Sequence, residues 1–330
     1  MAFYLPTIGA PYVVQAFIDN AKWADLLAAG VVQHRPDLEA ALAAGGDFID
    51  LPKFDLGGAF ARGDRTSTSA AVSYTDGSST DDKAVVLADV AGDTHLRDDV
   101  IRSGANFSAN VGATIGERLA IRLLGQLARM TSVAITKVDT PTSNIHVHDV
   151  RSANASVASM DTARYKMGDN AEALTTIFLH SRVMKDLIAD AYTNFSVDVF
   201  GADLMFNGKT RALLGIENFI VSDLATNTGF GSGSTGGDSY DSVLMGPGAI
   251  YLAFQSAPEV EEELDTTNVS TKIQIKTRMN YLLHPRGIKW TSTGNPSDAN
   301  YGSAANWDEG YSDHRNVKLV LYQTSSSIVA

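Results

Sequence analysis

Apolar positions recur at helical spacing in one segment of the chain, between Asn106 and Met130. Such spacing is the mark of an amphipathic helix, and the residues that carry it are Val111, Ile115, Leu119, Leu123 and Leu127. Ser108 is a candidate N-cap for this helix. Gly112, Gly116 and Gly125 weaken helix propensity, but small residues also let another backbone come close. We therefore predict a long helix that packs tightly along one face.

The segment before this helix predicts an arm and two short helices. Met1 to Arg35 contains Pro6 and Pro11 and then an apolar run, which indicates an extended arm followed by a short helix. Asp37 to Ala44 fits a second short helix that ends at Gly45 and Gly46.

Two strand-like segments flank a long polar stretch. Phe48 to Phe54 and Asp82 to Val90 read as strands, whereas Asp55 to Asp81 between them is rich in Gly, Ser, Thr and Asp. The polar stretch has too few apolar residues to bury a core of its own. A connection of this length inside a compact domain is commonly functional. We expect a β-ribbon that projects and docks on another molecule.

The second half of the chain mixes helices and strands. Asp169 to Ala191 predicts one or two helices, Leu204 to Leu214 predicts a hairpin with Asn207-Gly208 at its turn, and Thr226 to Asp238 is a polar loop. Further strands are predicted at Ala249–Phe254, Ser270–Leu283 and Lys318–Thr324. Scattered strands and helices in this order indicate an α+β fold.

Composition narrows the classes of protein. With 44% hydrophobic and 19% charged residues, ordered globular structure is expected. The chain has no cysteine, which excludes disulfides, thiolate catalysis and cysteine-ligated zinc. No apolar run approaches the ~20 residues of a membrane span, and the start lacks the basic residues of a signal peptide. The net charge of −12 argues against a free-standing DNA-binding protein.

Three local patterns could carry chemistry, and each has a simpler interpretation. Gly231 to Gly236 matches the dinucleotide-binding spacing, but no helix pattern follows it, so a surface loop is favoured. His146 and His148 could begin a zinc site with Asp149 or His180, although exposed histidines explain them as well.

The third pattern is the acidic run from Glu259 to Glu263, interpreted as a solvated or subunit-facing segment. The chain contains neither a nucleophile elbow nor a phosphate-binding loop of the Walker type. We therefore predict no catalytic residue, no metal, no cofactor and no enzymatic activity.

Two further segments resemble motifs of the major capsid proteins of tailed bacteriophages. They are Ser242–Ile250, which contains Gly246-Pro247-Gly248-Ala249, and Tyr281–Trp290, which contains His284-Pro285-Arg286-Gly287. The resemblance implies the Hong Kong 97 capsid fold, and the order of predicted elements agrees with it across nearly the full length.

The resemblance also implies a division of the chain. Residues 1–45 would form the N-terminal arm with short helices, and residues 46–100 the extended loop, a β-hairpin. Residues 101–160 and 266–330 would form the peripheral domain with the spine helix at 106–130, and residues 161–265 the axial domain. The tail from Ser292 to Ala330, with Tyr301, Trp307 and Tyr311, looks like an elaboration to which the sequence assigns no role.

The implied function is that of a shell subunit. It would self-assemble as pentamers and hexamers into an icosahedral virion head around double-stranded DNA, bound without sequence specificity, in the host cytoplasm and without a membrane. Scaffolding, portal and cement proteins are candidate partners, and the arm starts so near Met1 that a scaffold is expected to be separate or already removed. An encapsulin-like compartment or another phage structural protein is the alternative.

Contacts between subunits are expected at the tip of the ribbon, at Phe60, Arg62, Arg65 and Tyr74. The fold's namesake links its subunits covalently through a lysine near this tip. Here the stretch from Asp55 to Asp82 contains no lysine, and Lys53 and Lys83 lie at the ends of the stem. Arginine stays protonated and cannot replace that nucleophile. The sequence therefore predicts a shell without covalent links between subunits.

Overall fold

The computed structural model describes residues 10–55, 78–103, 106–138, 145–194, 216–224, 239–265, 271–293, 296–310 and 314–325. Its helices are α1 (Ala10–Ile18), α2 (Ala21–Ala28), α3 (Pro36–Ala43), α4 (Arg97–Ser103), α5 (Asn106–Ala134), α6 (Val157–Arg164), α7 (Ser181–Asn194) and α9 (Asp298–Tyr301). Short 3-10 helices are η1 (Ile135–Lys137), η2 (Tyr165–Ala173), η3 (Ala304–Asn306) and η4 (His314–Asn316). None of these described helices is long and apolar enough to cross a membrane.

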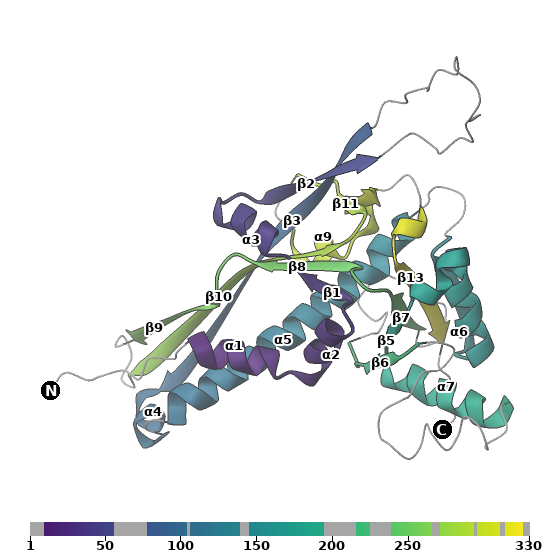
Figure 1. Cartoon of the computed structure of the whole chain (residues 1–330). Coiled ribbons are helices and arrows are strands. Elements are labelled where there is room, and N and C mark those ends of the chain that lie inside the picture. Colours follow the sequence, from purple (N-terminus) through teal and green to yellow (C-terminus); the bar gives the residue numbers. More distant parts are fainter. Residues whose placement is uncertain are drawn as a thin grey trace, which may run out of the picture.

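A six-stranded sheet forms the elongated part of the molecule (Figure 1). Its strand order is β1 (Val32–His34), β8 (Ile250–Phe254), β10 (Lys272–Pro285), β3 (Ser78–Leu96) and β2 (Phe48–Asp55), with β9 (Glu259–Asp265) also paired to β10. The antiparallel pair of β3 and β10 runs from Leu96 opposite Lys272 to Val86 opposite Leu282. The spine of this region is α5, which lies along the two long strands (Figure 1).

A five-stranded mixed sheet forms the second region. Its order is β4 (Val147–Asn154), β13 (Leu319–Ser325), β7 (Ser239–Met245), β5 (Thr176–Leu179) and β6 (Asn218–Val221). One face packs on α6 and α7, and the other joins the hydrophobic core that contains α5. A small third sheet pairs β11 (Ile288–Trp290) with β12 (Trp307–Glu309).

The long helix is confirmed and extends to Ala134. Ile115, Leu119, Leu123 and Leu127 are buried, as the apolar spacing requires. The N-cap prediction for Ser108 is wrong, because the helix already begins at Asn106 and Ser108 is buried inside its first turn.

The close approach predicted from the glycines is confirmed at one of them. A Cβ on Gly116 would lie only 2.4 Å from the carbonyl oxygen of Val13 in α1. The backbone of α1 therefore occupies the space that a side chain at this position would need.

The N-terminal prediction is corrected in part. From Ala10 onward the chain is helical, not extended, and the apolar run divides into α1 and α2. The division falls at Asn20, whose side chain accepts a hydrogen bond from the backbone N–H of Trp23 and so caps α2. Pro11 is tolerated because it stands in the first turn of α1.

Most strand predictions are confirmed, with one clear error. The strands predicted at 249–254, 270–283 and 318–324 correspond to β8, β10 and β13. Residues Thr176–Leu179, predicted as helix, form β5, because β6 and β7 pair with it on both sides and the segment is fully buried. The predicted hairpin at 204–214 and the polar loop at 226–238, which includes the Gly231–Gly236 pattern, lie outside the described residues.

Candidate assembly site at the ribbon root and sheet junctions

The predicted ribbon is present as an antiparallel pair of β2 and the first part of β3. Phe48 pairs with Val85 and Asp55 with Ser78. From Val86 onward, β3 pairs with β10 instead. We call the segment Asp82–Val86, where β3 passes from one partner to the other, the ribbon root.

A buried carboxylate fixes the ribbon root to the end of β10. Asp82 Oδ1 lies 3.0 Å from His284 Nε2, and Asp82 Oδ2 accepts a hydrogen bond from the backbone N–H of Gly287 at 3.2 Å. A carboxylate accepts hydrogen bonds, so Nε2 carries the proton. The side chain of His284 is fully buried and that of Asp82 is 7% exposed. Removing the carboxylate of Asp82 would leave the buried Nε2–H of His284 without this acceptor.

This contact gives the segment Tyr281–Trp290 a structural role. His284 lies next to the end of the part of β10 that pairs with β8, and Gly287 forms the following turn with a φ of +84°, which favours glycine. Both residues bind the same carboxylate, 202 and 205 positions away in sequence. The motif therefore couples the ribbon to the six-stranded sheet.

The segment Ser242–Ile250 forms the crossing between the two sheets. It leaves β7 in the five-stranded sheet and enters β8 in the six-stranded sheet. The N–H of Gly246 donates to the carbonyl of Lys318 at 3.0 Å, and the N–H of Gly248 donates to the carbonyl of Gly30 at 2.8 Å. A Cβ on Gly246 would lie 2.7 Å from the carbonyl oxygen of Ala173, so this tight crossing requires glycine.

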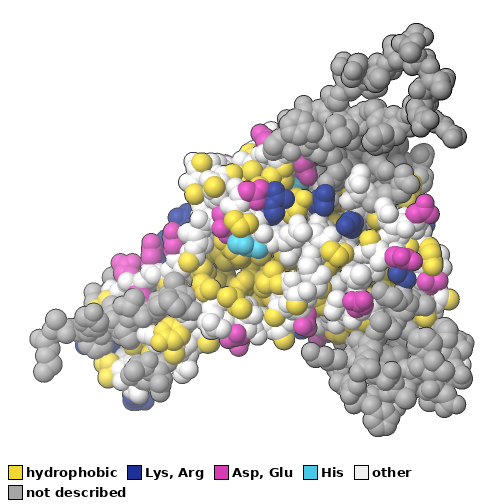
Figure 2. Space-filling model, in the orientation of Figure 1, with side chains coloured by type: hydrophobic (Ala, Val, Ile, Leu, Met, Phe, Trp, Pro, Cys, Tyr) yellow, Lys and Arg dark blue, Asp and Glu magenta, His cyan; other side chains and the backbone are white. Residues whose placement is uncertain are grey.

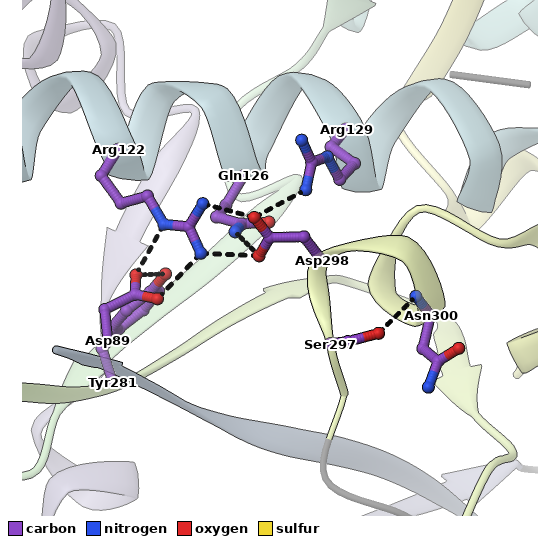
Figure 3. Close-up of polar contacts among 8 residues, drawn as sticks. All are labelled: Asp89, Arg122, Gln126, Arg129, Tyr281, Ser297, Asp298 and Asn300. Carbon is purple, nitrogen blue, oxygen red and sulfur yellow. Dashed lines mark hydrogen bonds and ion pairs between the residues drawn. The ribbon is translucent and has the colours of Figure 1, made fainter. Parts of the chain in front are cut away.

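A charged network holds α5 against the sheet and against the C-terminal segment (Figure 3). Arg122 forms ion pairs with Asp89 in β3 at 2.9 Å and with Asp298 in α9 at 2.6 Å. Gln126 and Arg129, one and two turns further along α5, also contact Asp298. Hydrogen bonding from Arg122 holds the pKa of the Asp298 carboxyl well below its usual range. Side chains from three positions along α5 therefore share one acceptor, the carboxylate of Asp298.

The described part of the tail from residue 292 contributes to the core, a role that the sequence left unassigned, whereas Tyr311 lies outside the described residues. Tyr301 and Trp307 are buried beside Trp290, with ring centroids 5.0 Å apart between the two tryptophans and 5.4 Å apart between Tyr301 and Trp307. The Tyr301 hydroxyl donates to the carbonyl of Leu283 at 2.5 Å. Burial raises the pKa of this hydroxyl well above its usual value. The aromatic residues Tyr301 and Trp307 were the sequence signal that could have revealed the role of the tail in the core.

The histidine pattern does not form a metal site within the described residues, where no group of three or more His, Asp or Glu side chains is placed to hold an ion. The alternative of exposed histidines is also wrong. His146 is fully buried, with Nδ1 donating to the carbonyl of Leu319 at 2.6 Å and Nε2 lying 3.0 Å from His314 Nδ1. His148 is half-buried and stacks on Tyr322, while His180 lies near Asp223 instead. These rings pack between strands and loops.

The acidic run from Glu259 to Glu263 forms most of strand β9. Its side chains alternate along β10, and Glu261 lies 3.5 Å from Lys276. Within the described ranges β9 pairs with β10 alone, so the run lies on an edge strand with a solvated side.

The four residues expected to contact neighbouring subunits, Phe60, Arg62, Arg65 and Tyr74, lie outside the described part of the chain. The stem beneath them is described. Lys83 lies in the stem, with its Nζ 3.9 Å from the centre of the Phe48 ring. This lysine is therefore engaged at the base of the ribbon.

Comparison with known proteins agrees with this architecture. A family model of the Gp13-like proteins, described as major capsid protein 13-like, matches residues 39–318. The curated major capsid protein of Bacillus phage SPP1 is 22% identical over 241 residues, which cover 68% of this chain and 71% of that protein.

Two solved capsid structures are similar in fold. The capsid asymmetric unit of cyanophage Pam1 matches with a TM-score of 0.58 and 13% identity, over 90% of this chain and 89% of that one. The capsid of Ralstonia phage GP4 matches with a TM-score of 0.58 and 11% identity, over 91% of this chain and 88% of that one. The family model covers most of the sequence, and the chain therefore belongs to the Gp13-like family of phage major capsid proteins.

Proposed function

We propose that this capsid protein assembles as pentamers and hexamers into an icosahedral head around phage double-stranded DNA. The observation that carries the proposal is the anchored ribbon. Its stem is fixed to the body by the buried contact of Asp82 with His284, and β2 with the paired part of β3 points away from β8 and β10 (Figure 1). An element that leaves the core while its base is held rigidly is suited to contact a neighbouring copy.

The proposed fold is of the Hong Kong 97 type. In this assignment the six-stranded sheet with α5 is the peripheral domain, β2 and β3 form the extended loop, and the five-stranded sheet is the axial domain. Sheet membership supports placing β4 and β13 with the axial sheet and β8 and β9 with the peripheral sheet, across the boundaries that the resemblance implies.

The ribbon tip is the proposed contact surface. Phe60 and Tyr74 would pack on a neighbouring copy, and Arg62 and Arg65 would pair with its acidic side chains. Scaffolding, portal and cement proteins remain candidate partners. The packaged DNA would meet a protein of net charge −12, which favours a mobile polymer over a sequence-specific complex. The role is structural, without a catalytic step, in the virion and after assembly in the host cytoplasm.

The test is direct visualisation of the expressed protein, alone and with the scaffolding protein of the same phage. Negative-stain electron microscopy should show closed shells or tubes. Small-angle scattering should give particles far larger than one chain of 35.1 kDa. A compact monomer under every condition would overturn the proposal.

The shell is expected to hold together without covalent links. Mature particles boiled in detergent should run as one band near 35.1 kDa on denaturing electrophoresis. The reason is that the tip lacks a lysine and that Lys83 is engaged at the stem by Phe48. A ladder of dimers and larger species would contradict this expectation.

A further inference from the structure

The outer edge of β9 is a strand edge that no described strand covers. β9 runs antiparallel to β10, with Glu259 opposite Arg278 and Asp265 opposite Lys272. Within the described ranges β10 is the only strand that pairs with β9, so its second edge has no described strand beside it. An open edge of this kind is a template on which another extended segment can add through main-chain hydrogen bonds.

The side chains along this edge are mainly acidic. β9 reads Glu-Val-Glu-Glu-Glu-Leu-Asp, so five of its seven residues carry a carboxylate. Because side chains alternate along a strand, Glu259, Glu261 and Glu263 share one face, and all three are exposed. Figure 2 shows a row of acidic side chains at the edge of the elongated region, where Figure 1 places β9. A segment added here would meet a carboxylate at every second position.

The neighbouring strand β10 neutralises this acidic row only weakly. Lys276 Nζ lies 3.5 Å from the carboxylate of Glu261, and the two side chains are 58% and 71% exposed. Ion pairs between exposed side chains contribute little, since water and salt screen them. Gln274, which stands opposite Glu263, is uncharged. The acidic row therefore keeps the capacity to pair with cations of a segment on the other side of β9.

The opposite face of β9 is partly apolar. Val260 is half-buried against the hydrophobic core, and Leu264 is 38% exposed. An added strand would therefore meet carboxylates on one of its faces and the side chains of Val260 and Leu264 on the other. This pattern specifies a partner with basic residues at alternate positions and apolar residues between them.

A second copy of β9 does not fit this edge. Like charges placed opposite each other on paired strands are destabilising, and each copy carries a net charge of −12. We infer that the outer edge of β9 binds, by strand addition, a basic extended segment of a different protein. The lysine or arginine side chains of that segment pair with Glu259, Glu261 and Glu263. The inference concerns the single subunit and goes beyond the proposed shell assembly, so each can fail without the other.

Peptide binding to dissociated subunits tests this inference. The probe is a fluorescein-labelled peptide, Lys-Val-Lys-Thr-Lys-Val-Lys, whose basic residues alternate. Its control has the same composition and charge in the order Lys-Lys-Lys-Lys-Val-Val-Thr, without the alternation. Fluorescence anisotropy should show that the alternating peptide binds roughly tenfold more tightly, because only its order lets the cations face the carboxylates across paired strands. Equal affinities would reduce the contact to nonspecific charge attraction and overturn the inference, as would binding of neither peptide.

Matched variants locate the binding edge. The double variant Glu261→Gln/Glu263→Gln should bind the alternating peptide roughly tenfold less tightly than the unmodified protein does. Asp169→Asn/Glu172→Gln removes the same charge from two exposed positions of η2, beside the five-stranded sheet, and should leave the affinity unchanged. Equal loss of affinity in both variants, or loss in neither, would contradict the assignment to β9.

Hydrogen exchange of the unmodified protein shows which segment the peptide covers. The alternating peptide should slow exchange in residues 259–265, because new main-chain hydrogen bonds protect the edge of β9. Slowing only elsewhere would place the peptide at a different site and overturn the inference. Subunits that dimerise without peptide, with slowed exchange in residues 259–265, would show that a second copy occupies the edge instead.

Discussion

The two sheets of this subunit are buried in different ways. Along β10 in the six-stranded sheet, buried and exposed residues alternate from Ile273 to Met279, so one face packs on α5 and the other meets solvent. Along β7 in the five-stranded sheet every residue from Ser239 to Met245 is buried. Alternation is typical of a sheet that is covered on one side, and continuous burial of a central strand that is covered on both.

This difference in burial means that the two sheets differ in how much surface they leave open. Among the described residues, the five-stranded sheet is covered by α6 and α7 on one face and by the core that contains α5 on the other. The six-stranded sheet keeps an open face, the β9 edge and the projecting ribbon. Within the described residues, the open sheet face and the unpaired edge therefore belong mainly to the six-stranded sheet, which polar contacts join to α5 and α9.

The strongest test addresses the helix that both regions share. Leu123 in α5 is fully buried in the core that also contains Met279 of β10 and Val243 of β7. Leu123→Asp would bury an unpaired charge and cost on the order of 5 kcal/mol or more, so the protein should not fold in soluble form. The soluble fraction after expression measures this. Ile121→Asp is the matched control, because Ile121 is 53% exposed on the same helix and the variant should remain soluble.

The next test acts on the six-stranded sheet alone. Asp82→Ala would leave His284 buried without its partner, and such changes cost ~3–5 kcal/mol. Urea unfolding of dissociated subunits gives the size of the loss, and hydrogen exchange should show faster opening of residues 78–85. Asp50→Ala, an exposed change on the same ribbon, should have little effect. Equal effects of the two variants would show that the buried contact does not anchor the ribbon.

The third test acts on the five-stranded sheet. Burial raises the pKa of Asp241 in β7 to about 6, although Gln323 donates a hydrogen bond to it at 2.9 Å. Between its ordinary pKa near 3.8 and about 6 the folded state holds a proton that the unfolded state has released. The stability contributed by this group is therefore complete at low pH and is lost as pH rises through about 6.

Asp241→Asn removes the free-energy cost of burying an ionised carboxylate above pH 6. The variant should match the unmodified protein near pH 4 and exceed its unfolding free energy at pH 7.5 by roughly 3 kcal/mol, from a shift of about two pKa units. Asp149→Asn is the control of opposite sign, because hydrogen bonds from Arg151 lower the pKa of Asp149. Urea unfolding curves of both variants at pH 4 and pH 7.5 give the free energies of unfolding. A pH-independent difference between Asp241→Asn and the unmodified protein would contradict a raised pKa for Asp241.

The smallest expected effects come from two glycines of the same helix. Gly116→Ala would place a methyl group 2.4 Å from the carbonyl of Val13 and force α1 to shift, at a cost of ~1–3 kcal/mol. Gly125→Ala meets no atom within 4 Å and should stabilise α5 by ~1 kcal/mol, since alanine favours the helix. Thermal unfolding of both variants measures the contrast. Destabilisation by Gly125→Ala would show that its surroundings are not open.

Several of these features could be predicted from the sequence, and others could not. The apolar spacing in 106–130 was sufficient for α5, because one helix face is encoded by local periodicity. The paired apolar strands around a polar stretch predicted the ribbon. The same periodicity misassigned Thr176–Leu179, because only pairing with β6 and β7 makes these residues a strand.

The candidate site was less accessible to sequence reasoning. His284 and Gly287 stood out as part of a motif, yet their shared partner Asp82 lies some two hundred positions earlier in the chain. Asp298 carried no local signal, although Arg122, Gln126 and Arg129 all converge on it. Charged and polar residues are common at surfaces, so a pattern in one segment does not reveal which of them become partners.

The sequence by itself determined the elements that are encoded within one segment: the spine helix, the ribbon strands, the glycines at tight turns and the absence of disulfides. The tertiary structure alone decided the strand order, which places β13 from the far end of the chain between β4 and β7. It also decided the burial of His146, Asp82 and Asp241. The physical reason is that periodicity specifies which face of an element is apolar, whereas its neighbours are chosen by packing among segments far apart in sequence.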